Sequence, residues 1–178
     1  MLKHACILVL LSQFGFAVSA QDTKTESLNV IGKNKTAIIA SERQKKDGYD
    51  GVFNYSPAVR AGDYIYASGV VAGAFGSEEP FGKEAFKASV RRALKGLEQT
   101  LKAGGADMND VIKINTFHVF DSPHTTLSKH EQVLAVAEVK NEFIGEPHPA
   151  WTAVGTTALY PDKGLVEIEV VVYSPQKK

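Results

Sequence analysis

The chain has 178 residues, of which 44% are hydrophobic, and its 20 basic and 20 acidic side chains give a formal net charge of zero. A chain of this size and composition can bury the core of one ordinary globular domain. The neutral balance argues against nucleic-acid binding as the main activity, because binding phosphates requires a local excess of Lys and Arg.

Residues 1–20 have the pattern of a secretory signal peptide. Lys3 and His4 form a short basic start, residues 5–18 are almost wholly apolar, and small residues precede Gln21. The apolar run is shorter than the roughly 20 residues that span a bilayer, so an uncleaved membrane anchor is the weaker interpretation. We therefore expect export, to a periplasm or out of the cell, and no membrane attachment after cleavage.

The mature chain is predicted to lack cysteine chemistry, because Cys6, the only cysteine, lies in the leader. Residues 21–51 are polar and rich in lysine, and we interpret them as an extension with one short strand over residues 37–40. Asn34 opens an Asn-Lys-Thr sequon that has meaning only in a eukaryotic host, so its glycosylation stays open.

The domain, residues 52–178, is predicted to open with a hairpin. Residues 52–59 and 64–71 are β-rich, and residues 60–63 connect them, with Gly62 supplying a positive φ. The glycine-bearing loop over residues 73–82 is not a phosphate loop, because no Gly-Lys-Ser/Thr follows and the spacing is not Gly-x-Gly-x-x-Gly.

Two helices and a strand are expected next. Apolar residues recur at helical spacing over residues 84–103, and Gly104-Gly105 ends that helix. Residues 111–120 read as a strand because they are rich in β-branched and aromatic side chains. A second helix fits residues 127–143, and its expected apolar side consists of Val133, Leu134, Val136, Ala137, Val139 and Phe143.

The last third of the chain contains two further strands, over residues 149–155 and 165–173. The second alternates, with Val166, Ile168, Val170 and Val172 on one face and Glu167, Glu169, Val171 and Tyr173 on the other. Turn-forming residues separate the two runs, so we predict adjacent antiparallel strands that bring Trp151 towards the Glu167 face. That face is the predicted wall of a cleft.

The order of elements predicts an α+β fold in which a mixed sheet carries both helices on one face. The opposite face would carry Val171 and Tyr173 and would have to be covered from outside the chain. Self-association is the economical way to cover it.

Over residues 52–174 the chain resembles the RidA family, the reactive-intermediate imine deaminases also called endoribonuclease L-PSP. The resemblance rests on the joint spacing of Tyr55, residues 64–69, residues 103–105, residues 110–113, Pro149-Ala150 and residues 166–170. It implies a chorismate-mutase-like fold, a homotrimer whose sheets form a central barrel, and small-molecule clefts between subunits. We expect neither a cofactor nor a metal.

The same resemblance implies roles for individual residues. Tyr55 matches the cleft tyrosine of the family, Ser68 and Gly69 match its serine-glycine pair, and Glu167 matches the glutamate that holds the attacking water. Each suits its role, as a phenol, a hydroxyl with a backbone donor, and a carboxylate general base. A strand tyrosine or glutamate is also an ordinary structural residue, so the joint match carries the assignment.

Trp151 departs from the family pattern, which reads Pro-Ala-Arg or Pro-x-Arg at this strand. The arginine grips the substrate carboxylate through two parallel hydrogen bonds, whereas an indole has one donor and no charge. We expect poor turnover of small 2-imino acids, a substrate that is less anionic and flatter or more apolar, and a gain of activity in Trp151→Arg. Packing at an interface is the equally supported role for Trp151.

Two further residues are candidates for the site. His148 is a possible proton donor, and Arg60 is the first substitute for the missing carboxylate anchor. His118, Asp121 and His124 cross a strand end and a Pro turn, so we expect no metal site there. Of the three functional hypotheses, hydrolysis of imines or enamines is the first and non-catalytic binding of a small molecule is the second. Ribonuclease activity is the least favoured, because the net charge of the chain is zero.

Overall fold

The computed structural model describes residues 27–176. The predicted signal peptide and Cys6 therefore lie outside the described residues, and export stays a prediction. Within the described range, no helix is long and apolar enough to cross a membrane.

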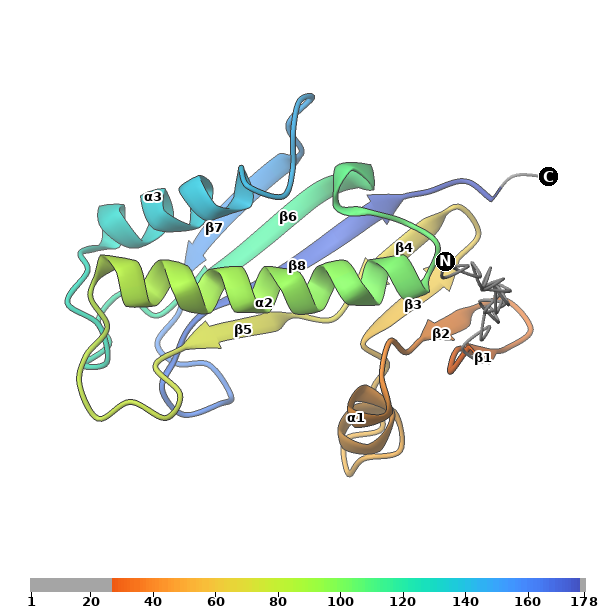
Figure 1. Ribbon diagram of the computed structural model, residues 1–178, viewed down its shortest axis with the longest axis horizontal. Coiled ribbons are helices and arrows are strands. Elements are labelled where there is room, and N and C mark those ends of the chain that lie inside the picture. Colours follow the sequence, from red (N-terminus) through yellow and green to blue (C-terminus); the bar gives the residue numbers. More distant parts are fainter. Residues whose placement is uncertain (1–26, 177–178) are drawn as a thin grey trace, which may run out of the picture.

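One mixed sheet of eight strands forms the body of the protein (Figure 1). The strand order is β1-β2-β3-β4-β8-β6-β7, with β5 pairing β8. β6 and β7 are parallel, and the other named pairs are antiparallel. The strands are β1 (Val30–Ile31), β2 (Thr36–Ile38), β3 (Ala58–Ala61), β4 (Tyr64–Ala67), β5 (Val70–Gly73), β6 (Val111–His118), β7 (Ala150–Gly155) and β8 (Gly164–Tyr173).

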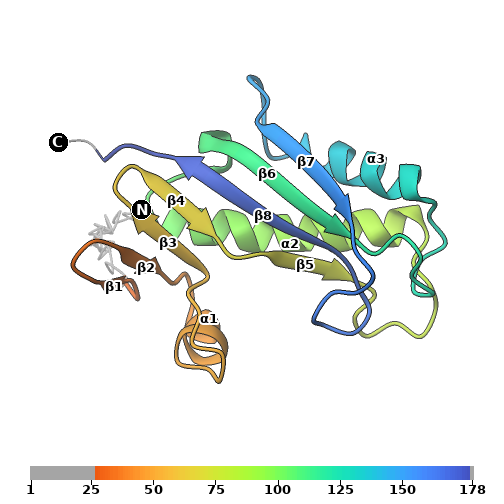
Figure 2. The same cartoon turned by 180° about the vertical axis from the view of Figure 1, so that it is seen from behind.

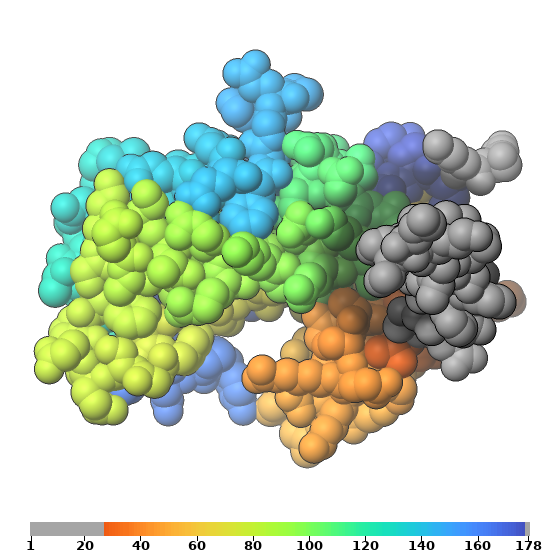
Figure 3. Space-filling model, viewed as in Figure 1, coloured from red at the N-terminus to blue at the C-terminus, as the bar shows by residue number. Residues whose placement is uncertain are grey.

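Two helices, α2 (Lys83–Ala103) and α3 (Lys129–Lys140), cover one face of the sheet, and the other face is open when seen from behind (Figure 2). The short helical segments are α1 (Glu42–Gln44), η1 (Lys45–Tyr49) and η2 (Met108–Asp110). The space-filling view shows α2 and α3 side by side (Figure 3), and the ribbon view shows the α1 segment projecting from the sheet (Figure 1). This arrangement confirms the predicted α+β fold with both helices on one face.

The sequence pattern of α2 is realised as predicted. Its apolar stripe is buried on the sheet, and the helix ends at Gly104, after which Gly105 has a φ of +78°. The left-handed conformation of Gly105 suits a residue without a Cβ. The buried apolar residues are Phe86, Val90, Leu94, Leu97 and Leu101.

α3 begins at a capping box in which the Ser128 side chain accepts from the Glu131 backbone and the Glu131 carboxylate accepts from the Ser128 backbone. The expected apolar side of this helix was partly wrong. Leu134 is 45% exposed, while the buried positions are Gln132, Ala135, Val136 and Val139. Their spacing of three, one and three residues defines the stripe that faces the sheet.

The segment before residue 52, predicted to be an extension, takes part in the sheet. β2 pairs with β3, and Ile38 and Ile39 are almost fully buried. Residues 52–57, predicted as strand, precede β3 instead. The expected hairpin is present between β3 and β4, and Gly62 has a φ of +59° at its turn.

The structure corrects one pairing that decides which side chains share a face. β7 and β8 were expected to be neighbours, but β6 lies between them and pairs with both. β7 is thus the parallel partner of β6 at the edge of the sheet. The turn-rich segment at residues 156–163 therefore crosses the end of β6 and does not close a hairpin.

Candidate active site

A break at Ser68 and Gly69 shapes the candidate site. Residues 64–71 were predicted as one strand, but Tyr66 pairs with Val171 and Val70 pairs with Ile168. Residues 67–69 thus oppose only residues 169 and 170, which is a β-bulge. The bulge is held by Ser68, whose Oγ donates to Ser56 O at 2.8 Å and whose backbone N–H donates to Pro57 O at 2.9 Å.

Glu167 on β8 lies directly against this bulge. A Cβ built on Gly69 would lie 2.0 Å from Glu167 Oε1 and 2.5 Å from Glu167 Cγ. Real Cβ atoms do not approach so closely, so the glutamate can keep its place only because position 69 is glycine. The glycine and the carboxylate form one structural unit.

The two residues lie in the wall of a pocket of about 690 Å³. The structure brings together in it the four predicted residues Tyr55, Ser68, Gly69 and Glu167. The sequence analysis missed the other lining residues, which are Asp47, Phe53, Val71, Tyr160 and Pro161. Val71 pairs with Glu167 across the strands, and a register for β5 would have identified it.

The aromatic residues of the pocket come from two loops. Phe53 and Tyr160 meet edge to face, with ring centroids 5.4 Å apart and an interplanar angle of 82°. The Tyr55 ring packs over Gly48, where a Cβ would lie 3.3 Å from the phenol Cζ, and the Tyr55 backbone N–H donates to Gly48 O. The segment before β3 thus supplies one wall, and the segment before β8 supplies another.

The electrostatics of the pocket favour a proton-accepting role for Glu167. Burial raises the pKa of the Glu167 carboxyl, and the charge of nearby Glu169 raises this pKa further. Glu169 is held by Asn115, whose Nδ2 donates to Glu169 Oε1 at 2.7 Å. A partly desolvated carboxylate with a raised pKa is a stronger base than a free glutamate.

Trp151 does not join this pocket. Its partner across the strands is Ile114, which also pairs with buried Val170, so its side chain shares their helix-covered face. The indole Nε1 donates to Thr116 Oγ1 at 3.0 Å, and the ring packs against the core. Both sequence interpretations, ligand platform and interface residue, are corrected: Trp151 is a partly buried core residue beneath the helices.

Arg60 and His148 also lie away from Glu167. Arg60 is buried, and its guanidinium donates to Ser174 O at 2.6 Å and to Gly104 O at 2.9 Å. His148 is exposed and lies just before the first residue of β7. Glu167 and Val154 both pair with Phe117, so Glu167 lies level with Val154, near the last residue of β7. Six residues of extended chain correspond to about 20 Å. Neither residue lines the pocket.

The histidines give no metal site in the described part of the chain, where no group of three or more His, Cys, Asp or Glu residues could hold an ion. His118 is fully buried, and its Nε2 lies 3.0 Å from Thr116 Oγ1. Burial lowers the pKa of His118 to about 4, so the ring is neutral near pH 7.

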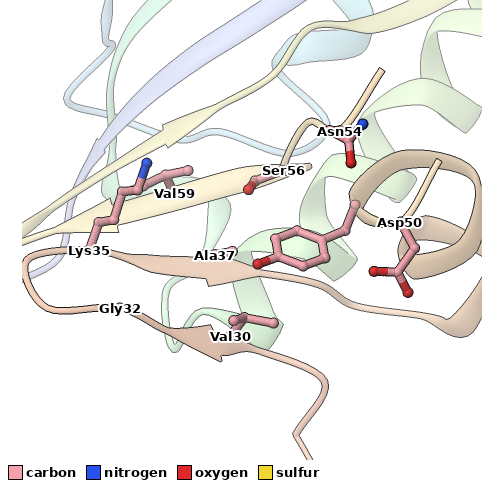
Figure 4. A pocket seen from close by; sticks show the side chains of 9 residues that line it. Val30, Gly32, Lys35, Ala37, Asp50, Asn54, Ser56 and Val59 are labelled. Atoms are coloured by element: carbon pink, nitrogen blue, oxygen red, sulfur yellow. The ribbon is translucent and has the colours of Figure 1, made fainter. Parts of the chain in front are cut away.

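A second pocket, of about 430 Å³, lies beside β1, β2 and β3 (Figure 4). It is lined by Val30, Gly32, Lys35, Ala37, Tyr49, Asp50, Asn54, Ser56 and Val59. Residues 47–56 contribute to both pockets and so form a partition between them. The polar extension, treated as separate in the sequence analysis, thus helps to build both.

Comparisons with known proteins identify the family to which this chain belongs. Residues 49–174 match the family model described as Endoribonuclease L-PSP. The RutC family protein YjgH of Escherichia coli is 36% identical over 126 residues, which cover 69% of this chain and 85% of that protein. The 2-iminobutanoate/2-iminopropanoate deaminase of Dermatophagoides farinae is 31% identical, over 66% of this chain and 84% of its own.

Solved structures give the same result. The structure of protein YjgH has a TM-score of 0.61 and 31% identity, and the match covers 82% of this chain and all of that one. RidA from an Antarctic Psychrobacter has a TM-score of 0.54 and 29% identity, over 69% of this chain and 90% of its own. By its family-model match, its relatives and its fold, this chain belongs to the RidA/YjgF family.

Proposed function

We propose that this protein hydrolyses an imine or enamine of a small metabolite to a carbonyl compound and ammonia, with Glu167 as the general base. The observation that carries the proposal is the position of Glu167, whose carboxylate lies against Gly69 in the wall of a pocket large enough for a metabolite. A relative with 31% identity carries the name of an imine deaminase, which supports the same reaction class.

The proposed hydrolysis needs water and one group that transfers protons, and Glu167 is that group. An enamine first tautomerises to the imine. Glu167 accepts a proton from water as the oxygen bonds to the C=N carbon, and the carboxyl then passes this proton to the nitrogen to give a carbinolamine. Glu167 then takes the hydroxyl proton and delivers it to the amino nitrogen as the C–N bond breaks, so that a carbonyl group forms, ammonia leaves and Glu167 is again a carboxylate. The raised pKa of Glu167 assists both directions of proton transfer, because acid and base forms are closer in energy than for a free glutamate.

The same pocket does not favour ribonuclease activity. Its lining includes two carboxylates, from Asp47 and Glu167, whereas binding to RNA phosphates relies on Lys and Arg. Binding of a small molecule without turnover is the alternative, and it uses the same residues.

Measurement of ammonia release separates hydrolysis from mere binding. Imines are generated in place from a panel of amines and amino acids by an oxidase, and ammonia release is followed with and without the mature protein. We expect the protein to accelerate hydrolysis of at least one imine above the rate in buffer. Saturable binding of the panel with no acceleration of any imine would establish the non-catalytic alternative.

We also propose assembly through the open face of the sheet, as a homotrimer. This face carries Tyr64, Tyr66 and Tyr173, all more than 40% exposed, with the Tyr64 and Tyr173 ring centroids 5.2 Å apart. Exposed aromatic clusters on one face are typical of association surfaces. Light scattering on the purified mature protein at micromolar concentration tests the proposal, and we expect three times the subunit mass.

A further inference from the structure

The charge of the Glu167 pocket points to a particular class of substrate. We infer that the pocket takes a flat, positively charged carbon–nitrogen group, such as an iminium or an amidinium, carried on an apolar body. This inference rests on the proposed hydrolytic function and names the substrate class of the same site.

The first support is the balance of charges in the pocket wall. Of the described residues that line it, Asp47 and Glu167 carry acidic side chains, and none is Lys, Arg or His. Glu167 is partly buried, so a ligand charge beside it is screened less than on an open surface. A ligand carboxylate would meet two like charges, whereas a cation would be attracted by both.

The nearby basic side chains do not reverse this balance. Arg43 Nε lies 3.4 Å from Asp47 Oδ2, but the Arg43 side chain is 90% exposed, and such surface pairs contribute little. Lys163 lies near the pocket in sequence, but its Nζ donates to Ser77 O at 2.8 Å. Arg60 is occupied by Ser174 O and Gly104 O on the helix-covered side of the sheet.

The second support is the aromatic character of the remaining wall. Phe53, Tyr55 and Tyr160 contribute aromatic rings, and all three are among the large hydrophobic residues exposed in the structure. The negative faces of such rings attract a planar cation while their area binds an apolar body. Acidic and aromatic residues together therefore select for flat cations and against small carboxylates.

The second acidic side chain of the pocket, Asp47, comes from the N-terminal segment of the chain. It belongs to η1, and η1 is fixed to the pocket by the Tyr55 ring that packs over Gly48. Residues 45–49, treated from the sequence as part of a simple extension, thus supply a charge to the site. Asp47 is a binding residue in this inference, distinct from the proposed base Glu167.

Binding of three matched probes tests the inference without any turnover. Benzamidine, benzamide and benzoate share a shape and differ in charge, and their dissociation constants are measured by calorimetry on the mature wild-type protein. We expect benzamidine to bind at least about tenfold more tightly than benzoate, with benzamide between them. Equal or tighter binding of benzoate, or no measurable binding of benzamidine, would overturn the inference.

Two variants locate the effect. Asp47→Asn is expected to weaken benzamidine binding severalfold while leaving benzamide unchanged. Asp162→Asn, which removes an exposed acid next to Pro161 outside the lining, is the matched control and should leave all three affinities unchanged. Loss of benzamidine affinity in Asp162→Asn but not in Asp47→Asn would contradict the assigned role.

The experiments distinguish a failure of the inferred ligand class from a failure of the proposed hydrolytic function. Charge selectivity without ammonia release from any imine would retain the ligand class and reject hydrolysis. Rapid hydrolysis of anionic 2-imino acids together with preferred binding of benzoate would retain hydrolysis and reject the ligand class.

Discussion

The carboxylate of Glu167 and the backbone of Gly69 occupy adjoining space, so that a Cβ added to Gly69 would lie 2.0 Å from Glu167 Oε1. The contact is possible because a β-bulge at residues 67–69 offsets β5 from β4 along β8. The bulge, the glycine and the glutamate together set the position of the proposed base.

Gly69→Ala should therefore damage the site more than the fold. The new methyl group must push the Glu167 carboxylate aside, and we expect a loss of hydrolytic rate of at least about tenfold and a loss of stability of about 1–3 kcal/mol, as for other overpacked sites. Urea unfolding and ammonia release measure the two effects. Gly96→Ala in α2, where an added Cβ meets nothing within 4 Å, is the control and should stabilise the helix by about 1 kcal/mol.

Trp151→Arg should not restore a carboxylate anchor, contrary to the expectation from sequence. The new guanidinium would lie among Leu94, Met108 and Val136 beneath the helices, and burying an unpaired charge there should cost several kcal/mol. Thermal unfolding should show a lower midpoint with no gain of 2-imino acid turnover.

Thr152→Arg is the informative counterpart. Thr152 pairs with Asn115, which pairs with Glu169, so an arginine there would lie on the Glu167 side of the sheet. We expect Thr152→Arg to remain folded. A stable, active Trp151→Arg protein would show that the indole does not occupy the core as described.

His118 should make the stability of the protein dependent on pH. Its folded pKa of about 4 lies below the ordinary value of 6.5, so the unfolded chain binds more protons between these two values. Stability should be full above pH 6.5 and fall as the pH drops towards 4, by roughly 3 kcal/mol in all.

Urea unfolding at pH 7 and pH 4.5 checks this effect. The difference between the two pH values should shrink in His118→Gln, which cannot titrate, and should persist in His130→Gln, a control on the exposed surface of α3. An unchanged difference in His118→Gln would assign the pH dependence to other groups.

Val171→Lys should disrupt the proposed trimer. Val171 lies on the open face, where it pairs with Tyr66, and a lysine there would be desolvated without a partner on assembly. We expect light scattering to report a lower mass for this variant. Leu134→Lys, on the exposed side of α3, is the control and should keep the wild-type mass.

The two long helices and four of the nine residues that line the pocket were predictable from sequence, whereas strand order was not. The 3.6-residue period of residues 84–103 and the alternation of residues 165–173 are local signals, and the structure has a helix and a strand there, each beginning one residue earlier. The pairing of β7 with β6 is a long-range choice that no local pattern records. That choice put Trp151 on the helix-covered face and misled the prediction of its role.

Asp47, Phe53 and Tyr160 were missed for a related reason. They belong to segments read as an extension, a strand and a turn, and only the folded chain brings them to one pocket. Tyr55, Ser68, Gly69 and Glu167 were found because family resemblance carries information about contacts across the sheet. No periodicity in the chain would have joined them.

The most direct test of the account is the rate of imine hydrolysis by Glu167→Gln compared with Glu169→Gln. The two substitutions are matched, since both residues project from the same face of β8 and differ in that Glu167 lines the pocket whereas Glu169 is held by Asn115. Removing a general base costs typically 10²- to 10⁴-fold in rate, so we expect a loss of that order in Glu167→Gln. Glu169→Gln removes only a neighbouring charge that helps to raise the pKa of Glu167, so we expect a much smaller loss, of less than about tenfold. Undiminished hydrolysis in a folded Glu167→Gln protein would contradict the assignment of Glu167 as the base.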